Sequence, residues 1–214
     1  MKNFELYKSI NTNDAGAVTG TAFIDPLNPL DSLFNDDNET GNFIRLESGI
    51  NYELSADLGY IRLRDMVMNE ILGCSFILED RNTGQVVMEV GSPADSLGTN
   101  LSLMMLKPRN SHPNHPSWPL MFKNVYYLGT NNINKEGFDL RIINDRLTVP
   151  SHLDTQGNPY ITLFGLDSLN ESGIRTADQK IDLTNPNIIN LTDGELFFPA
   201  FHPFAADTVL DGNQ

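Results

Sequence analysis

The sequence contains little cysteine, few basic residues and no long apolar run, and each shortage excludes a class of protein. The single cysteine, Cys74, rules out an internal disulfide and any zinc site built from several cysteines. The 14 basic residues against 28 acidic ones give a formal net charge of −14, whereas a duplex-binding protein needs cations to displace phosphate counterions. We therefore expect neither nucleic acid nor an anionic membrane surface as a partner.

The chain also lacks the sequence features of membrane insertion. No run of about 18 apolar residues occurs, so we expect no transmembrane helix and no direct insertion of this chain into a membrane. Residues 1–5 lead into polar sequence, not into the apolar core of a signal peptide. This pattern fits either a cytoplasmic protein or a fragment of a larger exported protein.

Common catalytic motifs are missing as well. The chain has no G-x-S-x-G, P-loop or G-x-G-x-x-G sequence. Cys74 is followed by Ser75–Leu78, which predicts a small buried thiol on a strand, and no histidine is near in the sequence to activate it. We therefore do not expect an enzyme.

What the sequence does contain is the patterning of a globular β protein. Of its 214 residues, 40% are hydrophobic and 20% charged, which is enough apolar material for a core. Asp65 as an N-cap predicts a short helix over 65–72, and Trp118-Pro119 suits the first turn of another helix, although 120–128 reads equally well as a strand. Short apolar or alternating runs between Asn, Asp and Gly turns predict strands at 43–46, 52–54, 60–63, 74–78, 85–90, 101–106, 138–143, 160–166, 185–191 and 196–198.

These elements predict a mainly β fold, an antiparallel and jelly-roll-like β-sandwich with one or two short helices. Residues 1–50 are expected to form an irregular lead-in, because 24–30 is broken twice by proline and 35–41 is an acidic, polar turn cluster. The strand-rich part, 51–204, is expected to be one domain. Residues 205–214 are expected to be a tail or linker.

Two groups of side chains invite a metal interpretation. His112 and His115 are three residues apart, but a zinc site needs at least one further ligand, and a proline-stiffened loop explains the pattern equally well. Acidic residues offer oxygen ligands for calcium, but they do not match the calcium loop D-x-[DN]-x-[DN]-G. We therefore predict no cofactor, with Ca²⁺ kept as the alternative at 36–39 and at Asp178, Asp182 and Asp193.

Aromatic side chains suggest one binding alternative. Trp118 together with Tyr126, Tyr127 and Tyr160 would make a sugar-stacking platform on a cell-surface, carbohydrate-binding β-sandwich. Residues of this type more often anchor a core or a loop. A catalytic pocket would have to gather His112, His115 or His202 with carboxylates.

Seven segments, taken in order, resemble a known family. They are Asn51–Leu63, Gly84–Gly91, Leu101–Lys107, Trp118–Gly129, Ile133–Leu140, Gly165–Asn170 and Asp193–Phe204. Together they resemble the soluble domain repeated within SprA (also called Sov), the outer-membrane translocon of the type IX secretion system in Bacteroidetes. The stretch from Trp118 to Gly129, with WPLMFKNVYYLG, and the FFPAFHPF ending are its most specific parts.

Some residues depart from the family pattern. The stretch 15–48 resembles an insertion without counterpart. Ala205 stands where the family motif ends in glycine, and the family's GRIYFP is GELFFP here. Four triplets of the type Asp-Ser-Leu or Asp-Thr-Val, as at 31–33 and 207–209, fit the O-glycosylation pattern of this phylum and favour an exported location.

The resemblance implies a non-catalytic domain of a giant outer-membrane β-barrel protein, active in protein secretion and gliding motility. Such a domain would be periplasmic or extracellular and would cap or shape the pore or dock partner proteins. Its partners would be the rest of the parent barrel chain, other secretion-system proteins and secreted cargo. The residues expected to matter are structural: Trp118 as a loop anchor, Asn124 for backbone groups, Tyr126 as part of the family motif, Gly129 at a turn, and Pro199 and Pro203 around the last strand.

Overall fold

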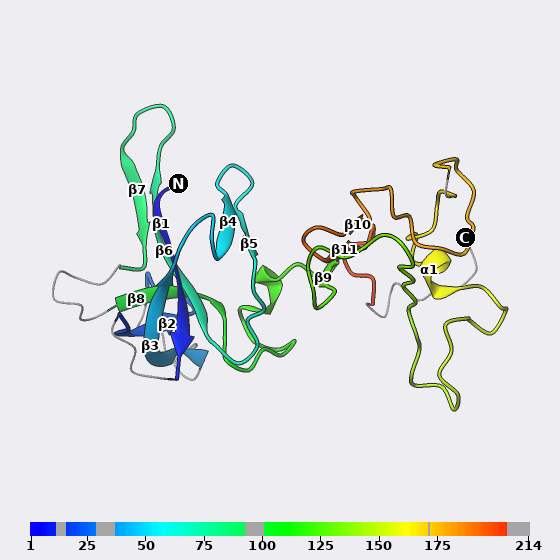
Figure 1. Cartoon of the computed structure of the whole chain (residues 1–214). Helices are drawn as coiled ribbons and strands as arrows, with labels where there is room; N and C mark the ends of the chain where they lie inside the picture. Colours follow the sequence, from blue (N-terminus) through cyan, green and yellow to red (C-terminus); the bar gives the residue numbers. More distant parts are fainter. Residues whose placement is uncertain (12–15, 29–36, 93–100, 171, 205–214) are drawn as a thin grey trace. The chain divides into compact units, whose positions relative to one another are not determined.

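The computed structural model describes residues 1–11, 16–28, 37–92, 101–170 and 172–204. The fold is mainly β, as predicted, and it divides into two compact units, Met1–Met121 and Phe122–Gln214 (Figure 1). This division differs from the predicted single domain over 51–204. The predicted tail, 205–214, lies outside the described residues.

The first unit is built almost entirely from strands. Six of them form one sheet in the order β1-β3-β2-β8-β6-β7, and all its pairs are antiparallel except β2–β8. The remaining two, β4 and β5, form a hairpin. In chain order the elements are β1 (Lys2–Ile10), β2 (Val18–Phe23), β3 (Glu39–Leu46), β4 (Tyr52–Ser55), β5 (Tyr60–Leu63), β6 (Leu72–Glu79), β7 (Val86–Val90), β8 (Leu101–Lys107) and the 3-10 helix η2 (Trp118–Leu120).

The sheet of the first unit closes on itself. Strand β1 pairs with β3 along one edge and with β6 along the other, so five strands form a barrel and β7 extends from it (Figure 1). A sandwich would instead have two separate sheets facing each other. The mainly β part of the prediction is therefore confirmed, while the arrangement of these strands is a closed barrel.

Both faces of the barrel wall are packed. One cluster consists of Tyr7, Ala22, Phe43, Ile71, Leu101, Leu103 and Met105, and it draws on β1, β2, β3 and β8. A second cluster includes Leu6, Leu72 and Cys74 on the opposite face of the wall, where residues of the β4–β5 hairpin cover them. The wall leaves little room between β2 and β8, because a Cβ at Gly20 would lie 2.5 Å from the Leu101 carbonyl oxygen.

Residues 1–50 contribute three strands to this barrel, in place of the predicted irregular lead-in. The neighbouring side chains Leu6 and Tyr7 are both buried although they point to opposite faces, so β1 shows no alternation to reveal it. Strand β2 reads Val-Thr-Gly-Thr-Ala-Phe and resembles loop sequence. The unmatched stretch 15–48 thus holds all of β2 and β3.

The predicted short helix over 65–72 is wrong. Met66 and Met68 are exposed whereas Ile71 and Leu72 are buried, so the apolar residues of the stretch share no common face, and β6 begins at Leu72. Ile71 instead donates its main-chain N–H to the Ser9 hydroxyl at 2.8 Å. The predicted strands 74–78 and 85–90 are confirmed as β6 and β7, which pair antiparallel as a hairpin.

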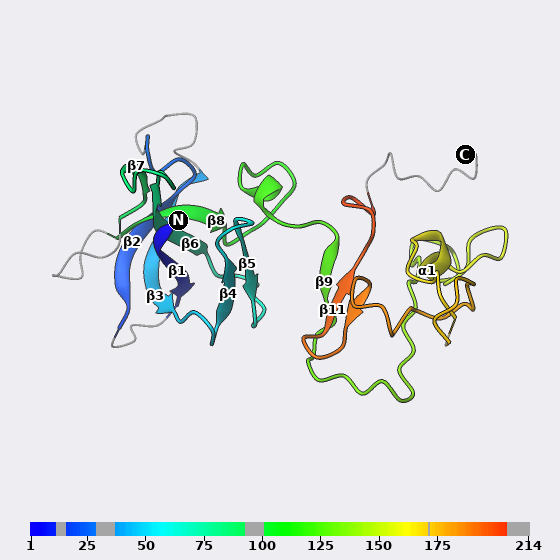
Figure 2. The same cartoon turned by 90° about the horizontal axis from the view of Figure 1, so that it is seen from above.

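The second unit has little regular structure. Its elements are β9 (Val125–Tyr127), the helix α1 (Tyr160–Leu163), β10 (Ile189–Asn190) and β11 (Glu195–Phe197). The strands form a small sheet in the order β10-β11-β9 (Figure 2). The predicted strand over 160–166 is wrong, because Pro159 precedes a short helix there. No described helix is long and apolar enough to cross a membrane.

The core of the second unit is made mostly by loop residues. Its buried members are Ile161, Leu166, Ile181, Ile188, Ile189, Leu196 and Phe198. Half-buried side chains from the stretch 138–142 pack against them. Such a core needs interactions other than strand pairing to fix its backbone.

Candidate functional site

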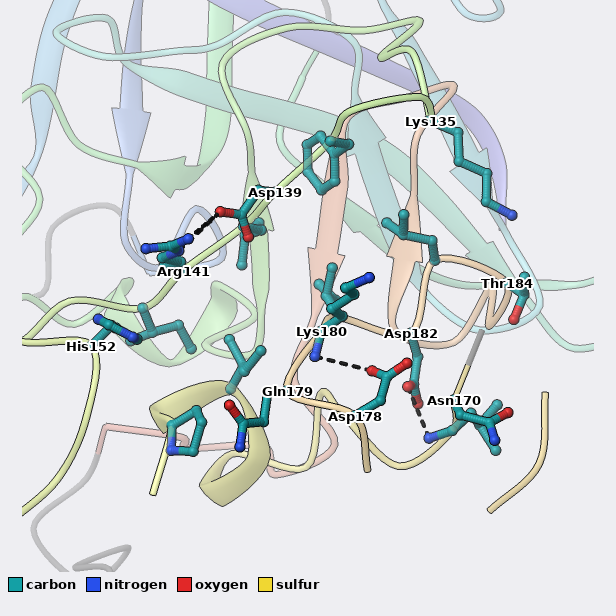
Figure 3. Close-up of a pocket in the computed structure, with 18 of the residues that line it drawn as sticks. Lys135, Asp139, Arg141, His152, Asn170, Asp178, Gln179, Lys180, Asp182 and Thr184 are labelled. Atoms are coloured by element: carbon teal, nitrogen blue, oxygen red, sulfur yellow. Dashed lines mark hydrogen bonds and ion pairs between the residues drawn. The ribbon is translucent and has the colours of Figure 1, made fainter. Parts of the chain in front are cut away.

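The second unit carries a groove with a volume of about 830 Å³. Residues 135–142 form one wall, and residues 178–184 form the opposite one. Figure 3 shows Lys135, Asp139 and Arg141 on the first wall and Asp178 to Thr184 on the second. Pro159, Ile161 and Leu169 add apolar surface to the lining.

The first wall is an extended segment with the side-chain alternation of a strand. Phe138, Leu140 and Ile142 are half-buried and pack on the core, whereas Asp139 and Arg141 are exposed. The Arg141 guanidinium contacts the Asp139 carboxylate at 2.8 Å. The predicted alternation over 138–143 is thus present, but the predicted strand is not, since no strand of the described chain pairs with it.

Two buried carboxylates hold the second wall in place. Asp167 accepts hydrogen bonds from the main-chain N–H groups of Asp178 and Gln179, both at 3.0 Å. Asp182 in return accepts from Ser168 and Leu169, at 3.1 and 2.9 Å. Each segment therefore supplies the carboxylate that binds the other segment's backbone, and we call Asp167 and Asp182 the carboxylate clamp.

The clamp is buried and fully engaged. Asp167 and Asp182 are each 3% exposed, and Asp167 also accepts the Thr162 hydroxyl at 2.7 Å. A buried carboxylate is stable only when hydrogen bonds satisfy it, and main-chain donors do so here. One residue in the clamped loop, Gln179, has a φ of +64° beside the groove. Sequence analysis named Asp182 only as a candidate calcium ligand and missed Asp167, because nothing in Gly165–Asn170 marks Asp167 as buried.

Asparagine and aspartate side chains order the rest of the second unit. In each case the side-chain oxygen accepts the main-chain N–H two residues further along the chain, which closes a local turn. The acceptors are Asn134, Asn144, Asp154, Asn170, Asp178, Asn185 and Asn190. The abundance of these residues in the sequence thus has a structural cause.

The candidate calcium ligands serve these roles. Asp182 belongs to the clamp, Asp178 accepts the Lys180 N–H at 3.1 Å, and Asp193 accepts from the Asn190 amide at 2.7 Å. Asp36 lies outside the described residues. Among the described residues, no group of three or more His, Cys, Asp or Glu side chains is placed to hold a metal ion.

The two clustered histidines lie in the first unit. His115 is 6% exposed, and its Nδ1 lies 2.9 Å from the Ser117 hydroxyl and accepts the Ser117 N–H at 3.2 Å. The exposed His112 packs edge-on against its ring, with the ring centres 5.6 Å apart. The Asp37 carboxylate lies 4.0 Å from His115 Nε2. The pair therefore stabilises a loop through hydrogen bonds and ring packing.

Cys74 is 2% exposed in the first unit. Burial raises the pKa of its thiol to about 12, so the thiol stays protonated at neutral pH. Since the thiolate is the nucleophile, this cysteine is chemically inert.

Two of the expected structural residues meet at the last strand. The Asn124 side-chain amide donates to the Phe198 carbonyl oxygen at 3.1 Å, and Phe198 N–H donates to the Asn124 carbonyl oxygen at 2.8 Å. Tyr126, on β9, packs edge-on against Phe198 and Phe204, with ring centres 5.4 and 5.8 Å away. These contacts join the beginning of the second unit to the end of its last strand.

The other expected residues have simpler surroundings. Gly129 is exposed with a φ of +86°, Pro199 is exposed beside Gly165, and Pro203 is buried. Trp118 is half-buried in η2 of the first unit. The three tyrosines considered with it for sugar stacking, Tyr126, Tyr127 and Tyr160, belong to the second unit.

No protein-family model matches the chain, and no curated protein sequence matches it.

Proposed function

We propose that the chain is a non-catalytic, protein-docking domain of a giant outer-membrane β-barrel translocon of the SprA/Sov type. In this role it caps or shapes the pore or docks partner proteins during type IX secretion and gliding motility. The resemblance in seven segments motivates the family. The observation that carries the docking role is the surface of strand β7.

Strand β7 exposes apolar side chains on both of its faces. Val86, Val87 and Met88 are 54%, 66% and 38% exposed. Successive residues of a strand point to opposite faces, so neither face of this part of β7 is covered. The hairpin extends away from the barrel in Figure 1, and it belongs to the family-like segment Gly84–Gly91. Clustered exposed apolar side chains mark interaction surfaces in soluble domains.

The acidic composition supports the same role. A net charge of −14 keeps a domain soluble and repels cargo of like charge from its surface. The buried carboxylates Asp167 and Asp182 accept main-chain hydrogen bonds and so have a structural role, which agrees with a scaffold.

The size and location of the native protein test this assignment first. Antibody raised against the chain should detect a very large protein in the outer-membrane fraction of source cells. A band near the chain's own 23.8 kDa in the cytosol or medium would reject the translocon role.

A substitution in the hairpin tests the docking surface. Val87→Asp in the native protein should reduce secretion or gliding while leaving the melting temperature of the isolated chain unchanged, because the side chain is exposed. Val149→Asp is the matched control, since Val149 is 74% exposed and lies outside the hairpin. Equal secretion in wild type and Val87→Asp would remove β7 as the docking surface.

A further inference from the structure

The stretch 138–143 has the burial alternation of a strand but no strand partner within the described chain. Its burial alternates, with Phe138, Leu140 and Ile142 toward the core. The Phe138 N–H bonds to the Lys135 carbonyl oxygen, and pairing begins again only at the Asn144–Ser151 bridge. Between these points, residues 139–143 make no main-chain hydrogen bond within the described chain.

Unpaired main-chain groups in an extended segment form an open edge. Each such residue presents a donor and an acceptor that water satisfies until another strand arrives. Residues 137–142 line the groove, so free space lies beside this segment. A volume of about 830 Å³ lies within the range of about 300–1,000 Å³ that bound organic ligands occupy, which suits a short extended peptide.

The charges of the groove indicate what kind of segment fits. Lys135, Arg141 and Lys180 line it, although the second unit as a whole is acidic. Three carboxylates also line it: Asp182 is buried in the clamp, Asp139 is paired with Arg141, and Asp178 accepts the Lys180 N–H. Lys135 has no ion pair within the described part of the chain, so its ammonium group can pair with a carboxylate of a bound segment.

The apolar lining sets a second requirement. Leu140, Ile161 and Ile181 belong to the core and also line the groove. In an added strand, alternate side chains would meet this apolar surface and the others would face the charged rim. The fitting occupant therefore alternates apolar and acidic residues.

We propose that residues 138–143 bind an extended, acidic segment of another polypeptide, which adds as a β-strand and lies in the groove. Main-chain hydrogen bonds to the open edge give the binding, and the apolar lining and Lys135 give the selectivity. This site lies in the second unit and does not depend on the β7 surface or on the translocon assignment.

Amide hydrogen exchange with a defined probe tests the pairing. The probe is an acetylated seven-residue peptide that alternates valine and glutamate, added to the whole chain. We expect slowed exchange at every second amide of 139–143, because a strand bonds its neighbour through alternate residues. Unchanged exchange at saturating peptide would overturn the proposal. The proposal would also be overturned if, without peptide, protection of these amides rose with the concentration of the chain. That result would show that a second copy of the chain occupies the groove.

Peptides with N-methylated amides distinguish main-chain pairing from nonspecific binding. One peptide carries N-methyl groups on the amides of one edge, and the other carries them on the amides of the opposite edge. Only one of the two should lose binding, because only one edge of an added strand faces residues 138–143. Equal affinities of both for the chain would overturn the proposal.

A charge reversal tests the role of Lys135. Lys135→Glu should weaken binding of the acidic probe by about fivefold, the scale of an exposed ion pair. Arg175→Glu is the matched control, because Arg175 is exposed and is not among the lining residues. Equal weakening by both variants would reduce the effect to net charge and remove the selectivity argument.

Discussion

Different interactions stabilise each of the two units of the chain internally. In the first, a ring of strands satisfies the backbone through ladders, and β1 is paired along both of its edges. In the second, the strands β10 and β11 contribute only short pairings, and side-chain oxygens of Asn and Asp bind much of the remaining backbone. The barrel closes its edges, whereas the second unit leaves one open.

This difference suggests that the two units offer partners different surfaces. A closed barrel has few free main-chain groups to offer a partner, except where β7 leaves it. A unit ordered by side-chain caps can keep an extended segment unpaired without losing its core. Substitutions that act on one mode of stabilisation and spare the other should make the contrast measurable.

The largest effect is expected from the barrel core. Phe43 is fully buried, and Phe43→Ala should destabilise the first unit by about 3–5 kcal/mol, the usual cost of removing a buried aromatic ring. The unfolding of the first unit, followed by site-resolved amide exchange in denaturant, measures this change. The amides of the second unit should keep their wild-type exchange rates, and a matching loss in both units would contradict their independence.

Two glycines of the second unit form the next comparison. Gly194 has a φ of +67°, and an added Cβ would lie 1.7 Å from the Thr130 carbonyl oxygen. Gly129 has a φ of +86°, but nothing lies within 4 Å of its Cβ position. Gly129→Ala should cost about 1–2 kcal/mol for the left-handed backbone alone. Gly194→Ala should cost clearly more, as measured by chemical denaturation, and equal costs would refute the close approach.

The carboxylate clamp should contribute on a similar scale. Asp182→Ala removes the acceptor of the Ser168 and Leu169 N–H groups and should cost about 1–3 kcal/mol, the scale of hydrogen bonds to a charged group. Its signature is faster exchange of these two amides with no change in the barrel. Asp145→Ala is the control, because Asp145 is exposed. If both variants leave the Ser168 and Leu169 amides unchanged, the clamp has no structural role.

The smallest effect concerns pH. The N–H of Asn158, together with its side-chain amide, lowers the pKa of Asp154 below its ordinary value. A lowered folded-state pKa means that this carboxylate stabilises its turn above the unfolded pKa and loses the contribution as pH falls through the folded value. The amides of Gln156 and Asn158 should therefore exchange faster, relative to free peptides, on acidification below about pH 4. Asp154→Asn should show no such pH-dependent change.

Sequence patterns located the strands with one clear periodicity and missed the others. The strands 74–78 and 85–90 were predicted from the turn residues between them, and the strand 101–106 from its continuous apolar run. Strand β1 is buried on both faces at Leu6 and Tyr7, so its pattern is hidden. The prediction of a strand at 138–143 identified the correct faces, since Phe138 and Leu140 pack on the core, but pairing depends on residues elsewhere in the chain.

The sequence indicated Asp178 and Asp182 of the site as candidate calcium ligands, but the clamp itself could not be predicted for a physical reason. The clamp joins Asp167 to residues 178 and 179, and Asp182 to residues 168 and 169, so neither bond is local enough to leave a motif. Predicted site residues such as Asn124 and Tyr126 do make contacts, with Phe198 in both cases. These contacts organise the unit but do not line the groove.

Native-state amide exchange of the free chain, resolved by residue, tests the central contrast most directly. We predict that amides bonded in the β1, β6 and β8 ladders exchange slowest, that those bonded to Asp167 and Asp182 are also protected, and that residues 139–143 exchange as if unstructured. Slow exchange at Leu140 and Ile142 in the free monomer would contradict the account, because it would show that the edge is already paired.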